Sequence, residues 1–343
     1  MILNAFAVLD GFLCLLRLGL GGAVLVLACV AWRQTGIRSS ENIDRLQDRC
    51  YLAFLLAGLL LVLDILSWPI FYLLLESYVS EWPGIMCIYG VTRIGTGSVG
   101  SSRFLPPLVT ALECAKPALI FLSGNWFVLY LLNRTSRTAP LTRRVLSVVL
   151  LTSILGSAVA VGELAYLVIP KKEDFPAAGC CTEAFDGEER LTRFVPRALL
   201  DESAVPWLWG GYYGVNTLML LSLTCCRPRL PRNGALAALL LMACLVAAVS
   251  GVFLVEVAVP RLIRLPSHHC PYDLVSRAPE SLLAIAFFIV GVFAIGWSCA
   301  VAWLGRHSET TDARSSLVGQ LLDLAVAGYA SSLLMISVEL ALT

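Results

Sequence analysis

Two neighbouring histidines and a cysteine are the side chains of this sequence best suited to binding a metal or exchanging electrons. They stand in the segment Ser267-His268-His269-Cys270-Pro271-Tyr272-Asp273, between two long apolar stretches. Imidazole and thiolate groups are donors that copper and zinc favour, so copper or zinc is the metal that this segment suggests. The third histidine of the chain, His307, also lies in a predicted loop.

Three more cysteines, Cys87, Cys180 and Cys181, lie in loops that we place on the same side of a membrane as Cys270. Together the four thiols could complete a soft metal site, exchange disulfides, or form two structural disulfides in an oxidising compartment. In the last case Cys180 and Cys181 would pair with Cys87 and Cys270 rather than with each other. No Cys-x-x-Cys spacing is present, so the usual motif of zinc sites and thiol oxidoreductases is missing.

A second set of reactive side chains lies inside the apolar stretches. Asp10, Glu113 and Glu163 each lie about five residues from the outer end of a stretch, where an ionisable group costs several kcal/mol unless it is paired or hydrated. Lys116 follows Glu113 by one helical turn. Together these four residues predict a hydrated acidic pocket under the outer loops that holds a metal or relays protons. The alternative is that the carboxylates reach the membrane interface.

Arg17 and Asp64 form a predicted pair deeper in the membrane. Counting residues from the ends of their stretches, at about 1.5 Å per residue, puts both near the middle of the bilayer. A single buried charge there would be far less favourable than a pair, so we expect a structural salt bridge between the first two helices.

Membrane-spanning helices must position all these residues. The chain has 343 residues, of which 58% are hydrophobic and 14% charged, and its mean hydropathy is +0.80. This composition is typical of a multi-span membrane protein, and the net charge of +1 argues against a nucleic-acid partner. Eight stretches are long enough to span the lipid bilayer as helices and predict an all-α bundle forming a single transmembrane domain over 1–343. They lie near 5–32, 51–75, 108–132, 145–168, 206–225, 235–259, 280–304 and 316–342.

The distribution of Lys and Arg predicts the orientation. One set of loops carries 13 basic residues in 50 positions, and the loops on the opposite side carry 10 in 87. The denser set is therefore assigned to the cytoplasm, which places both termini outside. The Ala-, Leu- and Arg-rich, Lys-poor composition favours a bacterial inner (plasma) membrane.

A weak internal repeat is also present. The second, fourth, sixth and eighth stretches each carry a glutamate near the outer end, namely Glu76, Glu163, Glu256 and Glu339. A loop with a proline and then a cysteine follows the first three. The pattern predicts four repeated helical hairpins, with coincidence as the alternative.

The leading functional hypothesis is metal handling or thiol and electron-transfer chemistry at the outer, periplasmic face. His268, His269, Cys270, Cys87, Cys180 and Cys181 would carry it, with an extracytoplasmic protein as partner. A first alternative is a secondary transporter, with Glu113, Lys116, Glu163 and Asn216 along the path. A second is a non-catalytic, disulfide-linked subunit of a larger membrane complex. No histidine lies inside a span and no Cys-x-x-Cys-His is present, so haem is not expected.

Overall fold

The chain is helical throughout the part that the structure, a computed structural model, describes. The described residues are 4–35, 43–82, 85–96, 100–169, 205–226 and 233–343. Seven of the helices in these ranges are long and apolar enough to cross a membrane, so the chain is a multi-pass membrane protein. The predicted stretch 206–225 corresponds to α6 (Val205–Cys226), which is not among the seven because Trp, Tyr, Gly and Asn residues lower its mean hydropathy. An eighth span therefore stays a prediction.

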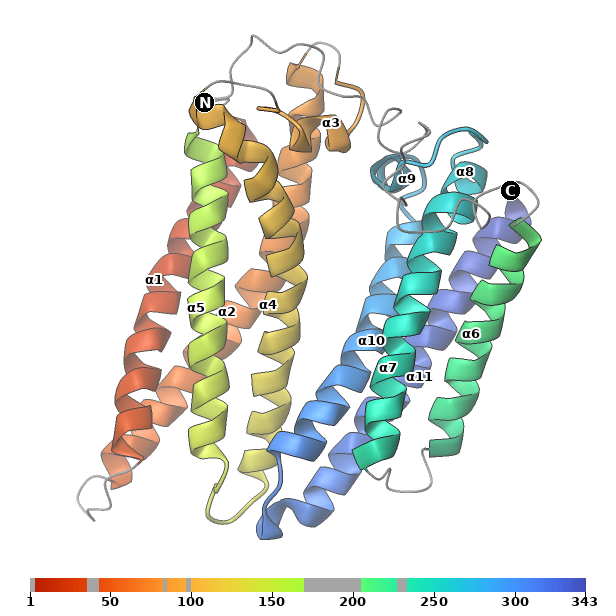
Figure 1. Cartoon of the computed structure of the whole chain (residues 1–343). Helices are drawn as coiled ribbons and strands as arrows, with labels where there is room; N and C mark the ends of the chain where they lie inside the picture. The colour runs from red at the N-terminus through yellow and green to blue at the C-terminus, as the bar shows by residue number, and fades with distance from the viewer. Residues whose placement is uncertain (1–3, 36–42, 83–84, 97–99, 170–204, 227–232) are drawn as a thin grey trace. The chain divides into compact units, whose positions relative to one another are not determined.

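The chain folds into two compact units, an N-terminal one of residues 1–178 with 307–310 and a C-terminal one of residues 179–306 with 311–343. Four long helices build the N-terminal unit (Figure 1): α1 (Ala5–Gln34), α2 (Ile43–Ser77), α4 (Leu105–Arg134) and α5 (Thr142–Val168). Within this unit α1 and α4 run in one direction, and α2 and α5 run in the other. The short helix α3 (Ile88–Thr92) lies at the end of the unit where α1 begins.

The buried residues of α1 explain how it packs. Most of them recur at alternating spacings of three and four: Ala7, Asp10, Cys14, Arg17, Gly21, Val24, Ala28 and Ala31. This spacing places them in one stripe along the helix, and the small members let another helix approach closely. At Gly21, an added Cβ would lie 3.1 Å from Ser157 Oγ of α5. The start of α1 is fixed by Asn4, whose Oδ1 accepts from Ala7 N at 2.8 Å and whose Nδ2 donates to Ser77 Oγ of α2 at 2.7 Å.

Four long helices also build the C-terminal unit: α6, α7 (Asn233–Phe253), α10 (Ser281–Leu304) and α11 (Thr311–Leu342). A π-helical turn, Leu254–Ala258, continues α7 into α8 (Val259–Leu262). The short helix α9 (Pro271–Arg277) follows and lies at the end of the unit where α6 begins (Figure 1). Glycines bring α10 and α11 into close contact, because a Cβ at Gly328 would lie 2.7 Å from Phe287 O and 2.8 Å from Gly291 N.

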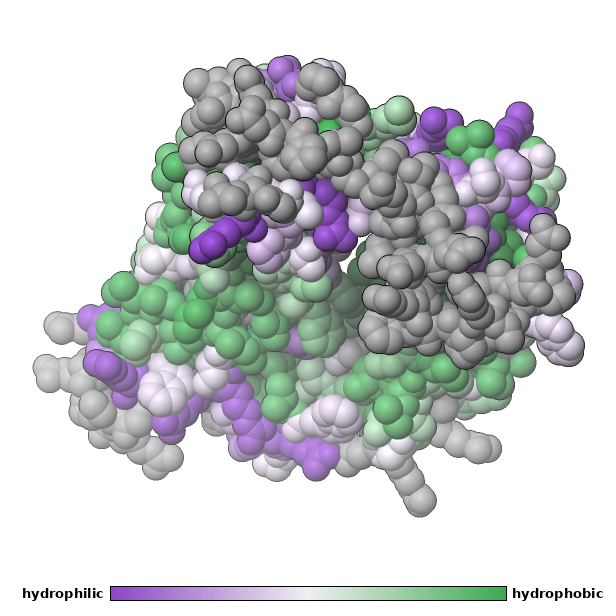
Figure 2. Space-filling model, turned by 45° about the horizontal axis from the view of Figure 1, so that its top comes forward, coloured by the Kyte–Doolittle hydropathy of each residue, from purple (hydrophilic) through white to green (hydrophobic). Residues whose placement is uncertain are grey.

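The outer surface of the helices fits a lipid environment. On α1, large apolar side chains such as Phe12, Leu15 and Val26 are exposed on the sides that other helices do not cover. Figure 2 shows the same distribution on one face, where hydrophobic side chains lie between hydrophilic ones at the helix ends. A soluble protein rarely exposes so much apolar surface, whereas a membrane-spanning helix must.

The two units share an order of elements. Each has two long helices, then a cysteine followed by a short helix, and then two more long helices. Cys87 immediately precedes α3, and Cys270 immediately precedes α9. The fourfold hairpin repeat stays a prediction. Among the described elements, one order of long and short helices occurs twice, once in each unit.

Candidate functional site

The outer-loop cysteines are only partly within the described residues. Cys180 and Cys181 lie outside them. Cys87 and Cys270 are buried and belong to different units. No disulfide is present among the described cysteines, so the two disulfides stay a prediction.

His268 and His269 each face a carboxylate of their own unit. His268 Nε2 lies 2.9 Å from Asp273 Oδ2, and His269 Nε2 lies 3.9 Å from Glu256 Oε2. In the described residues neither histidine belongs to a group of three ligand atoms close enough to hold a metal ion. Each histidine thus lies near an acidic side chain, and the copper or zinc site stays a prediction because Cys180 and Cys181 lie outside the described residues.

The ionisable residues inside the spans come together in the N-terminal unit instead. We name this set the buried ionic cluster: Asp10, Cys14 and Arg17 of α1, Asp64 of α2, Lys116 of α4 and Glu163 of α5. All six are at most 4% exposed. The three members on α1 are spaced by four and three residues, which places them on one face of that helix. Every long helix of the unit therefore contributes to one site.

Glu163 is the centre of the cluster. Its Oε2 accepts from Arg17 Nη1 at 2.5 Å and from Cys14 Sγ at 3.1 Å, and its Oε1 pairs with Lys116 Nζ. On the other side of the guanidinium, Arg17 Nε lies 2.8 Å from Asp64 Oδ1. Because charge-assisted hydrogen bonds of this kind are roughly twice as strong as neutral ones, they hold the four helices in register.

Lys116 is held by α2 as well as by Glu163. Its Nζ donates to Ser67 O at 3.2 Å and lies 4.7 Å from the ring centroid of Phe71. Pro69 lies between these two residues, inside α2, and Pro117 directly follows Lys116 inside α4. A proline inside a helix removes a backbone hydrogen bond and bends the helix. Both α2 and α4 therefore carry a helix-bending residue close to the ammonium group of Lys116.

The charges of the cluster do not balance. Three carboxyl groups, those of Asp10, Asp64 and Glu163, face only two cationic groups, those of Arg17 and Lys116. Among the residues that the structure describes, neither oxygen of Asp10 has a hydrogen-bond partner, although Asp10 is fully buried. One ligand atom each from Asp10, Cys14 and Glu163 lies within 4.8 Å of the other two. These three residues could hold a metal ion.

A small cavity extends the polar region beyond Asp64. It has a volume of about 10 Å³, close to what one water molecule needs, and Ser123 and Ser153 line it together with Asp64. Ser123 Oγ has no hydrogen-bond partner in the described part of the chain. Gly156 of α5 lies nearby, since a Cβ on it would lie 3.7 Å from Asp64 Oδ2. Polar atoms thus continue from the cluster toward the middle of the unit.

The predicted acidic pocket and the predicted salt bridge share this one site. Asp10, Lys116 and Glu163 belong to it, whereas Glu113 is exposed on α4. Asn216 lies in the C-terminal unit, where its Nδ2 donates to Tyr212 O at 2.9 Å. Cys14 was not predicted as a site residue, although its spacing of four and three residues to Asp10 and Arg17 places all three on one face of a helix.

No protein-family model, no curated protein and no solved structure matches this chain. A functional conclusion therefore rests on the geometry of the site itself.

Proposed function

We propose that the chain is a secondary transporter whose N-terminal unit binds one proton or monovalent cation at Asp10. The observation that supports this is the charge balance of the buried ionic cluster, in which three carboxyl groups meet two cationic groups. An unbalanced charge in the membrane interior costs several kcal/mol, so the cluster favours the uptake of one positive charge. Asp10 is the place for it, because its oxygens have no hydrogen-bond partner among the described residues.

The unmatched charge of the site, which lies between helices inside the spans, favours transport over a purely structural role. A structural cluster gains most when every charge has a partner, as Arg17 has in Asp64 and Lys116 has in Glu163. Ionisable residues that lack such a match inside spans typically mark ion or proton pathways. Secondary transporters bind their coupling ions deep in the membrane, between helices.

The state of Cys14 indicates which cation binds. With a neutral thiol, one monovalent positive charge balances the cluster, and with a thiolate, a soft divalent ion such as Zn²⁺ would be needed. Cys14 Sγ lies 3.1 Å from Glu163 Oε2, and because a thiolate this close to a carboxylate would be repelled by it, we infer a neutral thiol that donates a hydrogen bond. We therefore favour a proton or a monovalent cation over zinc.

Cation-dependent thermal unfolding tests the binding step. Purified protein in lipid nanodiscs would be titrated with Na⁺, K⁺, Zn²⁺ and acid, because a ligand of the native state raises the unfolding temperature as its concentration rises. We expect a response to acid or to one monovalent cation, abolished by Asp10→Asn and kept by Glu113→Gln, which changes an exposed carboxylate. A response that survives Asp10→Asn would contradict the proposal.

Flux in proteoliposomes tests the transport step. A gradient of the cation that stabilises the protein should drive its movement, followed by a pH-sensitive or ion-sensitive dye. Asp10→Asn should lose this flux, and Glu113→Gln should retain it. If the cation binds but no flux is seen with any tested cargo, the protein binds cations without transporting them, and the transporter proposal is wrong.

A second candidate function is thiol or metal chemistry at the outer cysteines, on an extracytoplasmic partner protein. One observation favours it, namely that Cys87 and Cys270 hold the same place in the order of elements of their two units. Disulfide mapping and elemental analysis of protein purified without reductant test it. Copper or zinc that is lost in Cys270→Ser would favour it, and fully formed disulfides without metal would favour a structural subunit. For every candidate we propose a bacterial inner membrane with both termini outside.

A further inference from the structure

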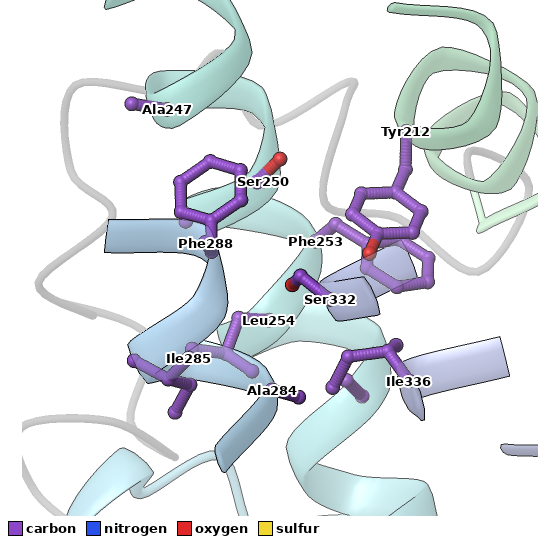
Figure 3. A pocket seen from close by; sticks show the side chains of 12 residues that line it. Tyr212, Ala247, Ser250, Phe253, Leu254, Ala284, Ile285, Phe288, Ser332 and Ile336 are labelled. Carbon is purple, nitrogen blue, oxygen red and sulfur yellow. The ribbon is translucent and has the colours of Figure 1, made fainter. Parts of the chain in front are cut away.

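We propose that the C-terminal unit binds a small aromatic molecule that carries one hydroxyl or carbonyl group. The site is a cavity of about 120 Å³ between the four long helices of this unit. Figure 3 shows its lining, which includes Tyr212 of α6, Ser250 and Phe253 of α7, Phe288 of α10, and Ser332 and Ile336 of α11. The inference rests on the C-terminal unit alone and does not depend on the cation site.

The size of the cavity selects a single ring. Protein interiors are close-packed, and voids larger than one water molecule are few. Apolar cavities of about 150 Å³ in other proteins stay dry and take up benzene. A cavity of about 120 Å³ is close to that size, so we infer that it takes one six-membered ring and no larger apolar group.

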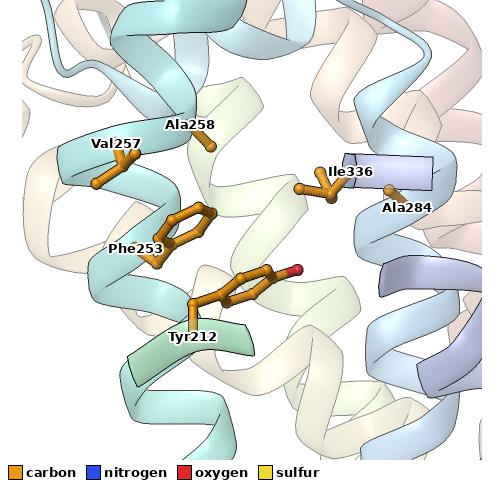
Figure 4. Close-up of a cluster of buried hydrophobic side chains, with 6 residues drawn as sticks. All are labelled: Tyr212, Phe253, Val257, Ala258, Ala284 and Ile336. Atoms are coloured by element: carbon orange, nitrogen blue, oxygen red, sulfur yellow. The ribbon is translucent and has the colours of Figure 1, made fainter. Parts of the chain in front are cut away.

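The walls of the cavity favour a flat apolar ring. The rings of Tyr212 and Phe253 stack with their centroids 4.0 Å apart and their planes 7° from parallel. Figure 4 shows this pair beside the apolar side chains of Val257, Ala284 and Ile336, which belong to the same buried cluster. Aromatic side chains provide broad contact area and preferred stacking geometries for another ring.

Hydroxyl groups on the lining define the polar part of the ligand. The Tyr212 and Ser332 side chains are 5% and 4% exposed, and Figure 3 shows the Tyr212 oxygen on the side of its ring toward Ser332. Ser250 is also part of the lining, and its Oγ accepts a hydrogen bond from Asn216 Nδ2 at 3.2 Å. Ligand sites are typically apolar pockets with a few convergent polar groups of this kind. A ligand with one hydroxyl or carbonyl would match them.

The helices around the cavity differ in how they are built. On one side α10 and α11 are locked together at Gly291 and Gly328. On another side α7 changes into the π-helical turn Leu254–Ala258, and both end residues of this turn line the cavity. Such turns occur frequently at functional sites. Gly251 is part of the lining and is exposed, so the cavity reaches the surface of the unit there.

Ligand-observed NMR of the full chain in nanodiscs tests the proposal, with phenol and benzaldehyde as probes and toluene as the apolar comparison. Ala284→Leu fills the cavity from α10 and should weaken binding on the order of tenfold or more, because the added atoms occupy the ligand's space. Ala286→Leu is the matched control, since Ala286 is exposed on the same helix. Tyr212→Phe combined with Ser332→Ala should remove the preference for phenol over toluene, which we expect to be roughly three- to tenfold.

The outcomes decide the proposal in either direction. Binding of phenol or benzaldehyde that Ala284→Leu abolishes and Ala286→Leu retains would establish the site. If Ala284→Leu does not fold, Ala247→Leu fills the same cavity from α7 and takes its place. Equal binding to filled and unfilled variants, or no binding of either probe to the native protein, would overturn it. A further probe, 4-decylphenol, distinguishes two sources of the natural ligand. If 4-decylphenol binds, the ligand is the ring of a membrane lipid. If it does not bind while phenol does, the ligand is a free aromatic compound.

Discussion

Arg17 on α1 and Glu163 on α5 meet inside the N-terminal unit, with Nη1 2.5 Å from Oε2 and at most 1% of either side chain exposed. The sequence separation of 146 residues between them means that the contact forms only when α1 has packed against α5. The pair therefore reports on the assembly of the helices as well as on the chemistry of the site.

Arg17→Met should destabilise the protein by roughly 3–5 kcal/mol, because it leaves the buried carboxylates of Asp64 and Glu163 without this partner. Unfolding in a denaturing detergent, followed by tryptophan fluorescence, measures the effect. Arg33→Leu is the control, since Arg33 is exposed near the end of the same helix and should change stability by at most about 0.5 kcal/mol. Adding Asp64→Leu to Arg17→Met should recover much of the loss, and a further large loss would show that the two residues do not act as a pair.

Asp10→Asn and Asp64→Asn should differ in their effect on stability, although both replace a buried carboxylate. Asp10→Asn removes the charge that has no cationic match, so stability should stay the same or rise by about 1 kcal/mol. Asp64→Asn weakens the partner of Arg17 and should cost roughly 2–4 kcal/mol. The same unfolding assay compares them without added cation. If both variants lose stability equally, Asp10 has a structural partner and the proposed charge imbalance is wrong.

Cys14→Ser and Cys14→Val separate the hydrogen bond of this residue from its packing. Serine keeps a donor toward Glu163 Oε2, so we expect a change of less than about 1 kcal/mol, whereas valine loses the bond and should cost roughly 1.5–3 kcal/mol. Thermal unfolding in nanodiscs checks both. The response to a proton or monovalent cation should persist in Cys14→Ser. Loss of a Zn²⁺ response in this variant would instead assign the site to a soft divalent metal.

Two glycines of α11 provide a matched test of the C-terminal unit. Gly328→Ala would place a Cβ 2.7 Å from Phe287 O on α10, so the helices must move apart at a cost of roughly 1–3 kcal/mol. Gly319→Ala meets nothing within 4 Å and should be neutral or stabilising by up to about 1 kcal/mol, because alanine favours the helix. The unfolding midpoints of the two variants measure the difference. Equal midpoints would mean that α10 and α11 do not pack closely in solution.

The depth of a residue in a span can be predicted from the sequence, but its direction around the helix cannot. Counting residues predicts that Arg17 and Asp64 lie level with each other, and the structure brings their side chains to 2.8 Å. Glu113 and Lys116 are also close in depth, one turn apart on α4. Yet Glu113 is exposed and Lys116 is buried against Glu163, because the neighbours of α4 decide which face is covered.

The sequence patterns do not predict which helices contact each other when those helices are distant in the sequence. The hairpin reasoning that pairs the first and second spans gives no reason to bring Glu163 of α5 beside Arg17 of α1. The buried stripe on α1 can be predicted from the sequence, since Asp10, Cys14 and Arg17 follow the same spacing as its small residues. A cysteine inside a span, taken alone, is however typical of a simple packing residue. The cavity of the C-terminal unit has no sequence signal, because it depends on how four helices fit together.

The stripe of α1 has a consequence for the rate at which the site can work. Asp10, Cys14 and Arg17 share the stripe with Ala7 and Gly21, so the charged residues sit on the part of the helix that approaches its neighbours most closely. Rotation of a side chain cannot open a path to a group that is fully buried in such a seam. If the proposed ligand of Asp10 is a metal cation rather than a proton, it should reach this site only when α1 moves away from its neighbours, and collective helix motions of this kind take microseconds to milliseconds. We therefore expect the exchange of such a cation to be limited by the movement of a helix and to be far slower than diffusion.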